Sequence, residues 1–141
     1  MSDERTYPTL RQVVLDSTDA RGLAEFYRQL LGLEYRPGDE PPPTGGDDPQ
    51  AREWLALRKN GESVLAVQPV DHLPAATWPE GPVPQQLHLD CTVPDTDELT
   101  VQHERALSLG ATLFLDRFDD DDEPLYVYAD PSGHPFCIFV G

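Results

Sequence analysis

The chain has 141 residues, a length typical of one compact domain, and 38% of them are hydrophobic, which suffices for a buried core. Its 26 acidic and 10 basic residues give a formal net charge of −16, so nucleic acid phosphates and anionic membrane surfaces repel the protein. We therefore expect neither nucleic acid nor a membrane as a partner.

The cysteines and the N-terminal residues favour a cytoplasmic protein. The sequence does not begin with a basic stretch followed by an apolar run, and no segment approaches the ~20 apolar residues that span a bilayer. Cys91 and Cys137 are isolated, which excludes a disulfide framework and a CxxC zinc site. We expect both thiols to be reduced.

The first half of the chain predicts a strand and then an amphipathic helix. Residues 10–17 are rich in apolar and β-branched side chains and end at a Ser-Thr-Asp cluster. Asp19 suits the N-cap of the helix that follows, and Gly32 suits its C-terminal end. An apolar stripe recurs at helical spacing between them, formed by Leu23, Phe26, Tyr27, Leu30 and Leu31.

Three more strands complete the first unit, which therefore reads β-α-β-β-β. They are expected at residues 33–36, 53–58 and 63–70, and an Asn-Gly pair at residues 60–61 indicates a hairpin between the last two. The segment from residue 38 to about 52 is rich in proline and glycine, and we expect an irregular loop that is either mobile or a lid.

The same order of elements restarts after a proline-rich linker at residues 71–84. A strand is expected at 86–93, and a helix is expected from Asp95 to Leu109. Three further strands are expected at 113–118, 125–129 and 135–140.

The two halves match in their offsets. Gln12 precedes Asp19 by seven residues, and His88 precedes Asp95 by the same number. We expect an α+β fold in a single domain of residues 1–141, with module one at 10–70, the linker at 71–84 and module two at 85–141. The two β-α-β-β-β modules should pair with their helices outside and a cavity between curved mixed sheets.

These segments resemble the vicinal oxygen chelate superfamily, which includes glyoxalase I, extradiol dioxygenases, fosfomycin-resistance enzymes and bleomycin-binding proteins. The resemblance rests on residues 13–16 and 26–32 in the first half, and on His88-Leu89-Asp90, residues 109–111 and residues 130–137 in the second. Within the superfamily, the chain looks most like the glyoxalase-like branch whose second half contains His-Leu-Asp and ends in Phe-Cys.

The resemblance implies a metal held by side chains from the first and last strands of each unit. The matching positions are Gln12, His88 and Cys137, with the fourth at Gln68 or, by another count, at Leu65. This set lacks the carboxylate of a standard glyoxalase site. We therefore expect no tightly bound cofactor, and at most a divalent ion (Zn, Ni, Mn or Fe) held weakly through His88 and Cys137, with Gln12 as a poor third ligand.

Strand alternation predicts which side chains face the cavity. One face of the strand at 86–93 carries His88, Asp90 and Thr92, and the matching face of the first strand carries Gln12, Val14 and Asp16. Such a polar row is either a ligand site or a hydrogen-bond network that satisfies itself. Gln68 and Cys137 join the candidate cavity from the last strand of each unit.

His88 and Asp90 are the candidate catalytic residues. His88 could be a metal ligand, an acid or base near neutral pH, or a hydrogen-bonded interior histidine. Asp90 is the carboxylate expected next to it and thus the candidate base, although it could instead only accept bonds from neighbours. Cys137 faces the cavity if Phe136 and Ile138 face the helix, or it is an inert buried thiol.

Aromatic residues and an acidic run remain open to two interpretations. Trp54 and Trp78, with Tyr126 or Tyr128, are either cavity walls or ordinary core and linker packing. The acidic run at residues 119–123 lacks the spacing of a calcium loop, so we interpret it as a solvated hairpin tip.

Two functions follow as hypotheses. In the first, the chain is a glyoxalase-like lyase or isomerase that acts on a small oxygenated metabolite. In the second, it is a non-enzymatic protein of the bleomycin-resistance kind that binds a cationic drug or antibiotic by charge and aromatic stacking. The resemblance implies a homodimer in both cases.

Overall fold

A computed structural model of the chain describes residues 6–78 and 80–141. In the first half, one sheet is formed in the order β1-β4-β3-β2, with β1 parallel to β4 and the other pairs antiparallel. Its elements in chain order are β1 (Val13–Ser17), α1 (Ala20–Leu31), β2 (Glu34–Tyr35), the 3-10 helix η1 (Gln50–Arg52), β3 (Leu55–Lys59) and β4 (Glu62–Pro69).

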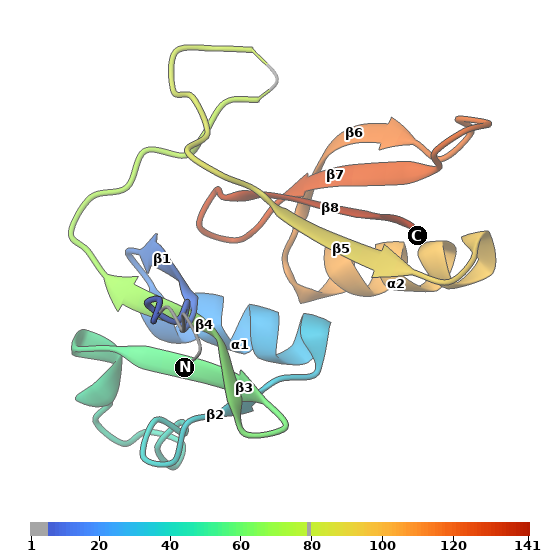
Figure 1. The fold of residues 1–141 in the computed structure, drawn as a ribbon. Helices are drawn as coiled ribbons and strands as arrows, with labels where there is room; N and C mark the ends of the chain where they lie inside the picture. The colour runs from blue at the N-terminus through green and yellow to red at the C-terminus, as the bar shows by residue number, and fades with distance from the viewer. Residues whose placement is uncertain (1–5, 79) are drawn as a thin grey trace.

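The second half repeats this arrangement in the order β5-β8-β7-β6, with β5 parallel to β8 (Figure 1). Its elements are β5 (Leu89–Val93), α2 (Thr96–Leu109), β6 (Thr112–Arg117), β7 (Leu125–Ala129) and β8 (Pro135–Val140). The α+β class and the two β-α-β-β-β modules expected from the sequence are confirmed.

Both helices begin and end at the residues that the sequence indicates. The side chain of Asp19 accepts a hydrogen bond from the backbone N–H of Gly22, and Asp95 does the same for Glu98. Gly32 and Gly110 follow the helices with positive φ angles of 66° and 119°, a backbone region that glycine adopts without steric cost.

The strand bounds differ from the expected ones where loops contact the sheets. The strand expected at 53–58 begins at Leu55, because η1 occupies the preceding residues. The strand expected at 86–93 begins at Leu89, so His88 lies just before β5 rather than within it.

The loop between β2 and β3 is anchored rather than free. The Arg21 guanidinium of α1 forms two hydrogen bonds with the carboxylate of Asp48, at 2.8 and 2.9 Å, and a third with the carbonyl oxygen of Asp39. The side chain of Asp39 is buried and accepts a hydrogen bond from the backbone N–H of Ala56. The loop is therefore attached to both the helix and the sheet of module one.

The helix α1 packs on the sheet of module one and also contacts module two. Half of its residues are buried, and Phe26 and Tyr27 make edge-on aromatic contacts with Phe136 of β8 at 5.7 and 6.1 Å. The two helices also contact each other (Figure 1). The apolar surface of α1 is thus wide enough to cover its own sheet and also to contact the last strand of module two.

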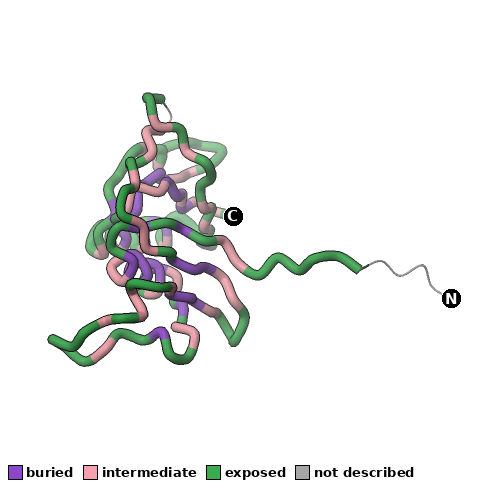
Figure 2. Tube along the Cα trace, turned by 90° about the vertical axis from the view of Figure 1, so that its left-hand side faces the viewer, coloured by how far each residue is buried: buried purple, intermediate pink, exposed green. Residues whose placement is uncertain are grey.

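The face of each sheet that points away from the helices is open. In β1, Leu15 and Ser17 are buried toward α1, whereas Val14 is 38% exposed and Asp16 is exposed. The segment that leads into β1 is exposed and runs away from the body of the molecule (Figure 2). Any site on the sheets must therefore lie on these open faces.

The turn between β7 and β8 connects module two to module one through polar contacts. Tyr27 donates a buried hydrogen bond of 2.6 Å to Asp130, whose other carboxylate oxygen accepts the backbone N–H groups of Ser132 and His134. The Ser132 hydroxyl also lies 2.7 Å from the buried Ser17 hydroxyl. Because Asp130 is buried, its pKa is raised despite these hydrogen bonds.

Tyr27→Phe is expected to destabilise the protein by about 1.5–3 kcal/mol at neutral pH, the usual contribution of a hydrogen bond to a charged group. Loss of the donor raises the folded-state pKa of Asp130 further. The destabilisation is therefore fully present above that pKa and shrinks as the pH falls through it. Urea unfolding at several pH values measures this, with Tyr35→Phe as the control because Tyr35 donates to Glu25 within module one. Equal losses for the two variants at all pH values would contradict the prediction.

Candidate functional site

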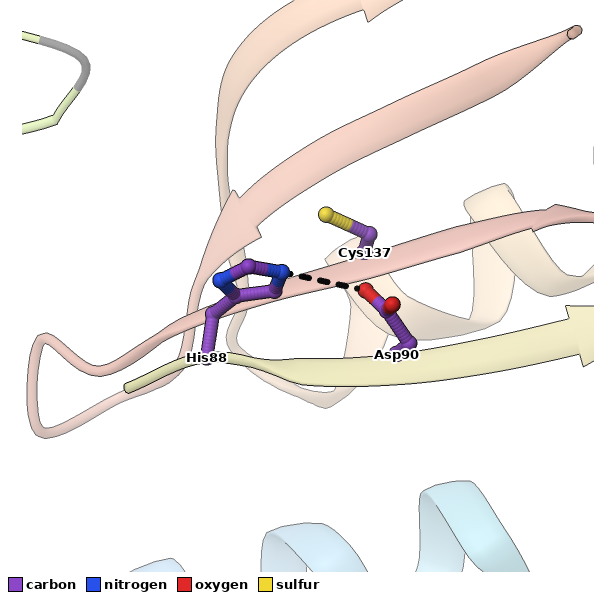
Figure 3. Close-up of side chains that lie close together, drawn as sticks. All are labelled: His88, Asp90 and Cys137. Atoms are coloured by element: carbon purple, nitrogen blue, oxygen red, sulfur yellow. Dashed lines mark ion pairs between the residues drawn. The ribbon is translucent and has the colours of Figure 1, made fainter.

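Three side chains that can bind a metal or a proton meet on the open face of the second sheet. His88 and Asp90 point to one side because they are two residues apart in an extended segment. The parallel pairing of β5 with β8 sets Cys137 opposite Asp90. One ligand atom from each residue lies within 4.8 Å of the other two (Figure 3). We call these three residues the donor trio.

His88 has an oxygen atom beside each of its ring nitrogens. Its Nε2 lies 3.2 Å from Asp90 Oδ1, and its Nδ1 lies 3.1 Å from Gln85 Oε1. A neutral imidazole carries one N–H and can donate to only one of these acceptors. Both contacts are favourable when the ring is an imidazolium, when the Gln85 amide turns its NH₂ group toward Nδ1, or when a cation lies between Nε2 and Asp90. His88 and Asp90 can therefore exchange a proton or share a cation.

The Cys137 thiol is held in its protonated form. Burial raises its pKa to about 11, and the negative charge of Asp90 acts in the same direction. Cys91, on the opposite face of β5, also has its pKa raised to about 11 by burial, and both cysteines are free. Cys137 therefore becomes a nucleophile or a metal ligand only when it releases a proton.

The donor trio lies in a pocket of about 410 Å³. Apolar side chains of the sheet form its floor, namely Leu115, Leu125, Val127 and Phe139. Trp78 of the linker also lines the pocket, with its ring centroid 6.5 Å from that of His88. Arg117 and Glu123 complete the lining. An apolar floor with a few convergent polar groups is the usual composition of a small-molecule site.

The donor trio fits a divalent metal ion. The ligand atoms of a four-coordinate zinc lie roughly 3.3–3.8 Å apart, so small side-chain rotations would bring the three atoms to that spacing. An imidazole, a carboxylate and a thiolate together neutralise a doubly charged ion and leave a fourth position for a substrate oxygen. His88 and Asp90 remain 42% and 58% exposed, which favours weak rather than tight binding.

The structure supplies a carboxylate ligand that the sequence-based metal set lacks. The sequence predicts only a catalytic role for Asp90, because strand alternation places it beside His88, and the pairing of β5 with β8 then adds Cys137 opposite it. The sequence does not indicate Arg117, and it predicts Glu123 only as part of a solvated hairpin tip, because no local pattern shows that β6 and this tip line the same pocket as β5.

Six other residues expected in the cavity lie outside the donor-trio pocket. They are Gln12, Val14, Asp16, Trp54, Gln68 and Thr92. Val14 and Asp16 line a separate pocket of about 230 Å³ beside the β7–β8 turn, and Thr92 lines a groove of about 540 Å³ between the modules. Gln12 has a buried side-chain oxygen without a hydrogen-bond partner among the described residues.

The aromatic residues divide between the site and the core. Trp78 lines the donor-trio pocket, whereas Tyr126 and Tyr128 are buried against α2. The His103 ring of α2 stacks on Tyr126 at 3.9 Å, and its Nδ1 lies 2.7 Å from the Tyr128 hydroxyl. The two tyrosines are thus core residues and not cavity walls.

The comparisons with known proteins agree with this architecture. The family described as "Glyoxalase-like domain" matches residues 12–139. No curated protein matches the chain significantly. Within the described residues, no helix is long and apolar enough to cross a membrane.

Solved structures share the fold at low sequence identity. The fosfomycin resistance protein FosX from Listeria monocytogenes is 14% identical, with a TM-score of 0.67 over 96% of this chain and 95% of that one. A glyoxalase/bleomycin resistance protein/dioxygenase family enzyme from Burkholderia phytofirmans PsJN is 14% identical, with a TM-score of 0.63 over 92% and 96%. An integron cassette protein from the mobile metagenome of Halifax Harbour Sewage Outfall is 20% identical, with a TM-score of 0.58 over 96% and 100%.

The fold and the site define an α+β protein of two β-α-β-β-β modules with a cluster of polar donors on one sheet. The chain belongs to the glyoxalase-like domain family. The resemblance to the vicinal oxygen chelate superfamily is thereby confirmed.

Asp90→Asn is expected to increase the reactivity of Cys137, because it removes a negative charge that opposes the thiolate. Rates of alkylation by iodoacetamide should be measured against pH in a Cys91→Ser background, which leaves one thiol. The profile of the Asp90→Asn variant should shift to lower pH, whereas Asp16→Asn, on the other sheet, should leave it in place. An unchanged or upward-shifted profile in the Asp90→Asn variant would contradict the electrostatic account.

Proposed function

We propose that this protein binds a small oxygenated metabolite in the donor-trio pocket and acts on it by lyase- or isomerase-type chemistry. The observation that carries the proposal is the meeting of an imidazole, a carboxylate and a thiol in an open pocket with an apolar floor. Membership of the glyoxalase-like family agrees with this reaction class without naming a substrate.

In this proposal the protein's own residues move the protons. Asp90 is the base that takes a proton from the carbon or oxygen next to a carbonyl group of the substrate, and His88 passes a proton to or from Asp90 across their 3.2 Å contact. Trp78 and Phe139 hold the apolar part of the substrate and exclude water from one side.

A divalent ion would be held by His88, Asp90 and Cys137. When bound, it would polarise the oxygen atoms of the substrate and stabilise the negative charge that develops on them. One FosX structure from Listeria monocytogenes contains Mn(II) and 1S,2S-dihydroxypropylphosphonic acid, which makes manganese a sensible ion to test beside zinc. We propose weak binding, because the site is open and the Cys137 thiol must lose its proton.

A second candidate is a protein that sequesters a cationic small molecule without converting it. The observation that favours it is the combination of Asp90, Glu123 and the Trp78 ring in one pocket of a chain with a net charge of −16. Without a metal ion, these groups attract a cation more strongly than an anion.

A homodimer and a cytoplasmic location are parts of the proposal. The open face of the first sheet and the exposed segment before β1 carry apolar side chains, of which Leu10 is 85% exposed and Val14 is 38% exposed. A second copy of the chain would cover this surface. The two free cysteines agree with a reducing compartment.

Zinc is expected to bind weakly, with one ion per chain. Because the Cys137 thiol releases one proton on binding, the affinity for zinc should fall about tenfold for each unit by which the pH is lowered. Calorimetric titration of the native chain should show this behaviour. His88→Ala should abolish the binding, and His72→Ala, at an exposed linker position, should leave it unchanged. Near-stoichiometric metal that survives dialysis would contradict the weak site, and binding that survives in His88→Ala would place the ion elsewhere.

The same samples decide between the two functions. Product formed from a thiol adduct of an α-oxoaldehyde, or from fosfomycin, and lost in Asp90→Asn would support the enzyme. Tight stoichiometric binding of a cationic drug without product would instead support the binding protein.

Sedimentation is expected to show a dimer at micromolar concentration, and Val14→Asp should convert it to a monomer by placing a charge on the covered face. The dimer should be weaker at low ionic strength, because both copies are strongly negative. Val101→Asp, at an exposed position of α2, is the matched control. A native chain that stays monomeric at all salt concentrations would contradict this arrangement.

A further inference from the structure

The pocket that holds the donor trio also contains a basic side chain, Arg117 at the end of β6. Arg117 pairs across the sheet with Leu125, and Leu125 pairs with Phe139 of β8. These three residues form a row that is parallel to the row of Leu115, Val127, Cys137 and Asp90. Arg117 therefore lies on the same sheet face as the donor trio and at the opposite edge.

Arg117 forms no salt bridge within the described part of the protein, although backbone hydrogen bonds and, to a smaller extent, its charge lower the pKa of the nearby exposed Asp120. Glu123 lines the same pocket. By contrast, Arg21, Arg28 and Arg52 each pair with a carboxylate. In a chain with 26 acidic and 10 basic residues, an arginine that faces a pocket without such a partner is available to an anionic ligand.

The distance between Arg117 and the donor trio suits a short molecule. The Cα atoms of Arg117 and Cys137 are separated by two strand spacings and two residues, which is about 12 Å. An extended arginine side chain covers about half of that distance. The remaining gap accommodates a chain of a few carbon atoms over the apolar floor of Leu125 and Val127.

We infer that Arg117 anchors the carboxylate of a short oxo- or hydroxycarboxylate whose other oxygen atom lies against the donor trio. This inference rests on the proposed function and names the substrate class of the same site. Without an ion, Asp90 and Glu123 disfavour a second negative charge, so monocarboxylates then bind better than dicarboxylates. An ion on the donor trio adds positive charge at the far end of the pocket and strengthens the binding of the anion.

The charge of the pocket also distinguishes a carboxylate ligand from the cationic ligand of the second candidate function. Without an ion, Asp90 and Glu123 outnumber Arg117 and the pocket is negative. A doubly charged ion on the donor trio, with the Cys137 proton released, brings the net charge of the pocket to zero. The preference for a carboxylate should therefore increase when zinc is added, and a preference for cations should decrease.

The test uses 4-oxopentanoate and its uncharged amide, 4-oxopentanamide, as probes, with 2-oxoglutarate as the dicarboxylate. Trp54→Phe leaves Trp78 as the single tryptophan, so its fluorescence reports binding in the pocket. Titrations are made with and without saturating zinc. The Trp54→Phe protein should bind 4-oxopentanoate at least about tenfold more tightly than the amide and, without zinc, more tightly than 2-oxoglutarate.

Arg117→Gln should remove the difference between 4-oxopentanoate and the amide and leave the binding of the amide unchanged. Arg52→Gln is the control, because it removes the same charge from a surface ion pair of module one. It should leave the preference for 4-oxopentanoate over the amide unchanged. Equal binding of 4-oxopentanoate and the amide by the Trp54→Phe protein would overturn the inference. A preference for 4-oxopentanoate that survives in Arg117→Gln would overturn it as well.

Zinc binding, measured in the same samples, separates the two levels of the proposal. Zinc that is lost in His88→Ala, together with no carboxylate preference, would leave the proposed function standing and overturn the role of Arg117. A carboxylate preference that is lost in Arg117→Gln, together with no zinc binding, would support Arg117 and overturn the metal site.

Discussion

The site depends on the parallel pairing of the first and last strands of module two. A parallel pair needs a crossover connection, and here α2, β6 and β7 lie between β5 and β8 in the chain. The pairing places Asp90 opposite Cys137, and strand alternation adds His88 on the same face. A shift of one residue in this register would turn Cys137 toward the helix and separate the donors. The geometry of the donor trio is therefore fixed by backbone hydrogen bonds.

Module one makes the same pairing without the same chemistry. β1 is parallel to β4, and Asp16 lies opposite Gln68 on an open face. In the repeat this pair corresponds to Thr92 and Phe139, and the position of Asp90 and Cys137 is occupied by Val14 and Ala66, which carry no metal ligand. The chemistry thus belongs to one module, while the other supplies α1, the polar contacts of the β7–β8 turn and an open face for a partner. Pairing the modules through α1 leaves both sheet faces accessible.

Much of the fold could be predicted from the sequence because it is encoded locally. Asp19, Gly32, Asp95 and Gly110 mark the helix ends, and apolar periodicity marks most strands. The contact of α1 with module two could not be predicted, because it depends on how Phe26 and Tyr27 pack against Phe136 far along the chain. Alternation indicated the shared face of His88 and Asp90. The approach of Arg117 depends on the order of strands in the sheet, which no local pattern reveals.

The central claim is that His88, Asp90 and Cys137 hold one divalent ion on the open face of the second sheet. The most direct measurement is the absorption spectrum of the protein with saturating Co(II), because a cobalt–thiolate bond gives a charge-transfer band that other ligands do not. The account predicts this band in the native chain and in Cys91→Ser, and its loss in Cys137→Ser and His88→Ala. A native chain without the band, or a band that persists in Cys137→Ser, would contradict it.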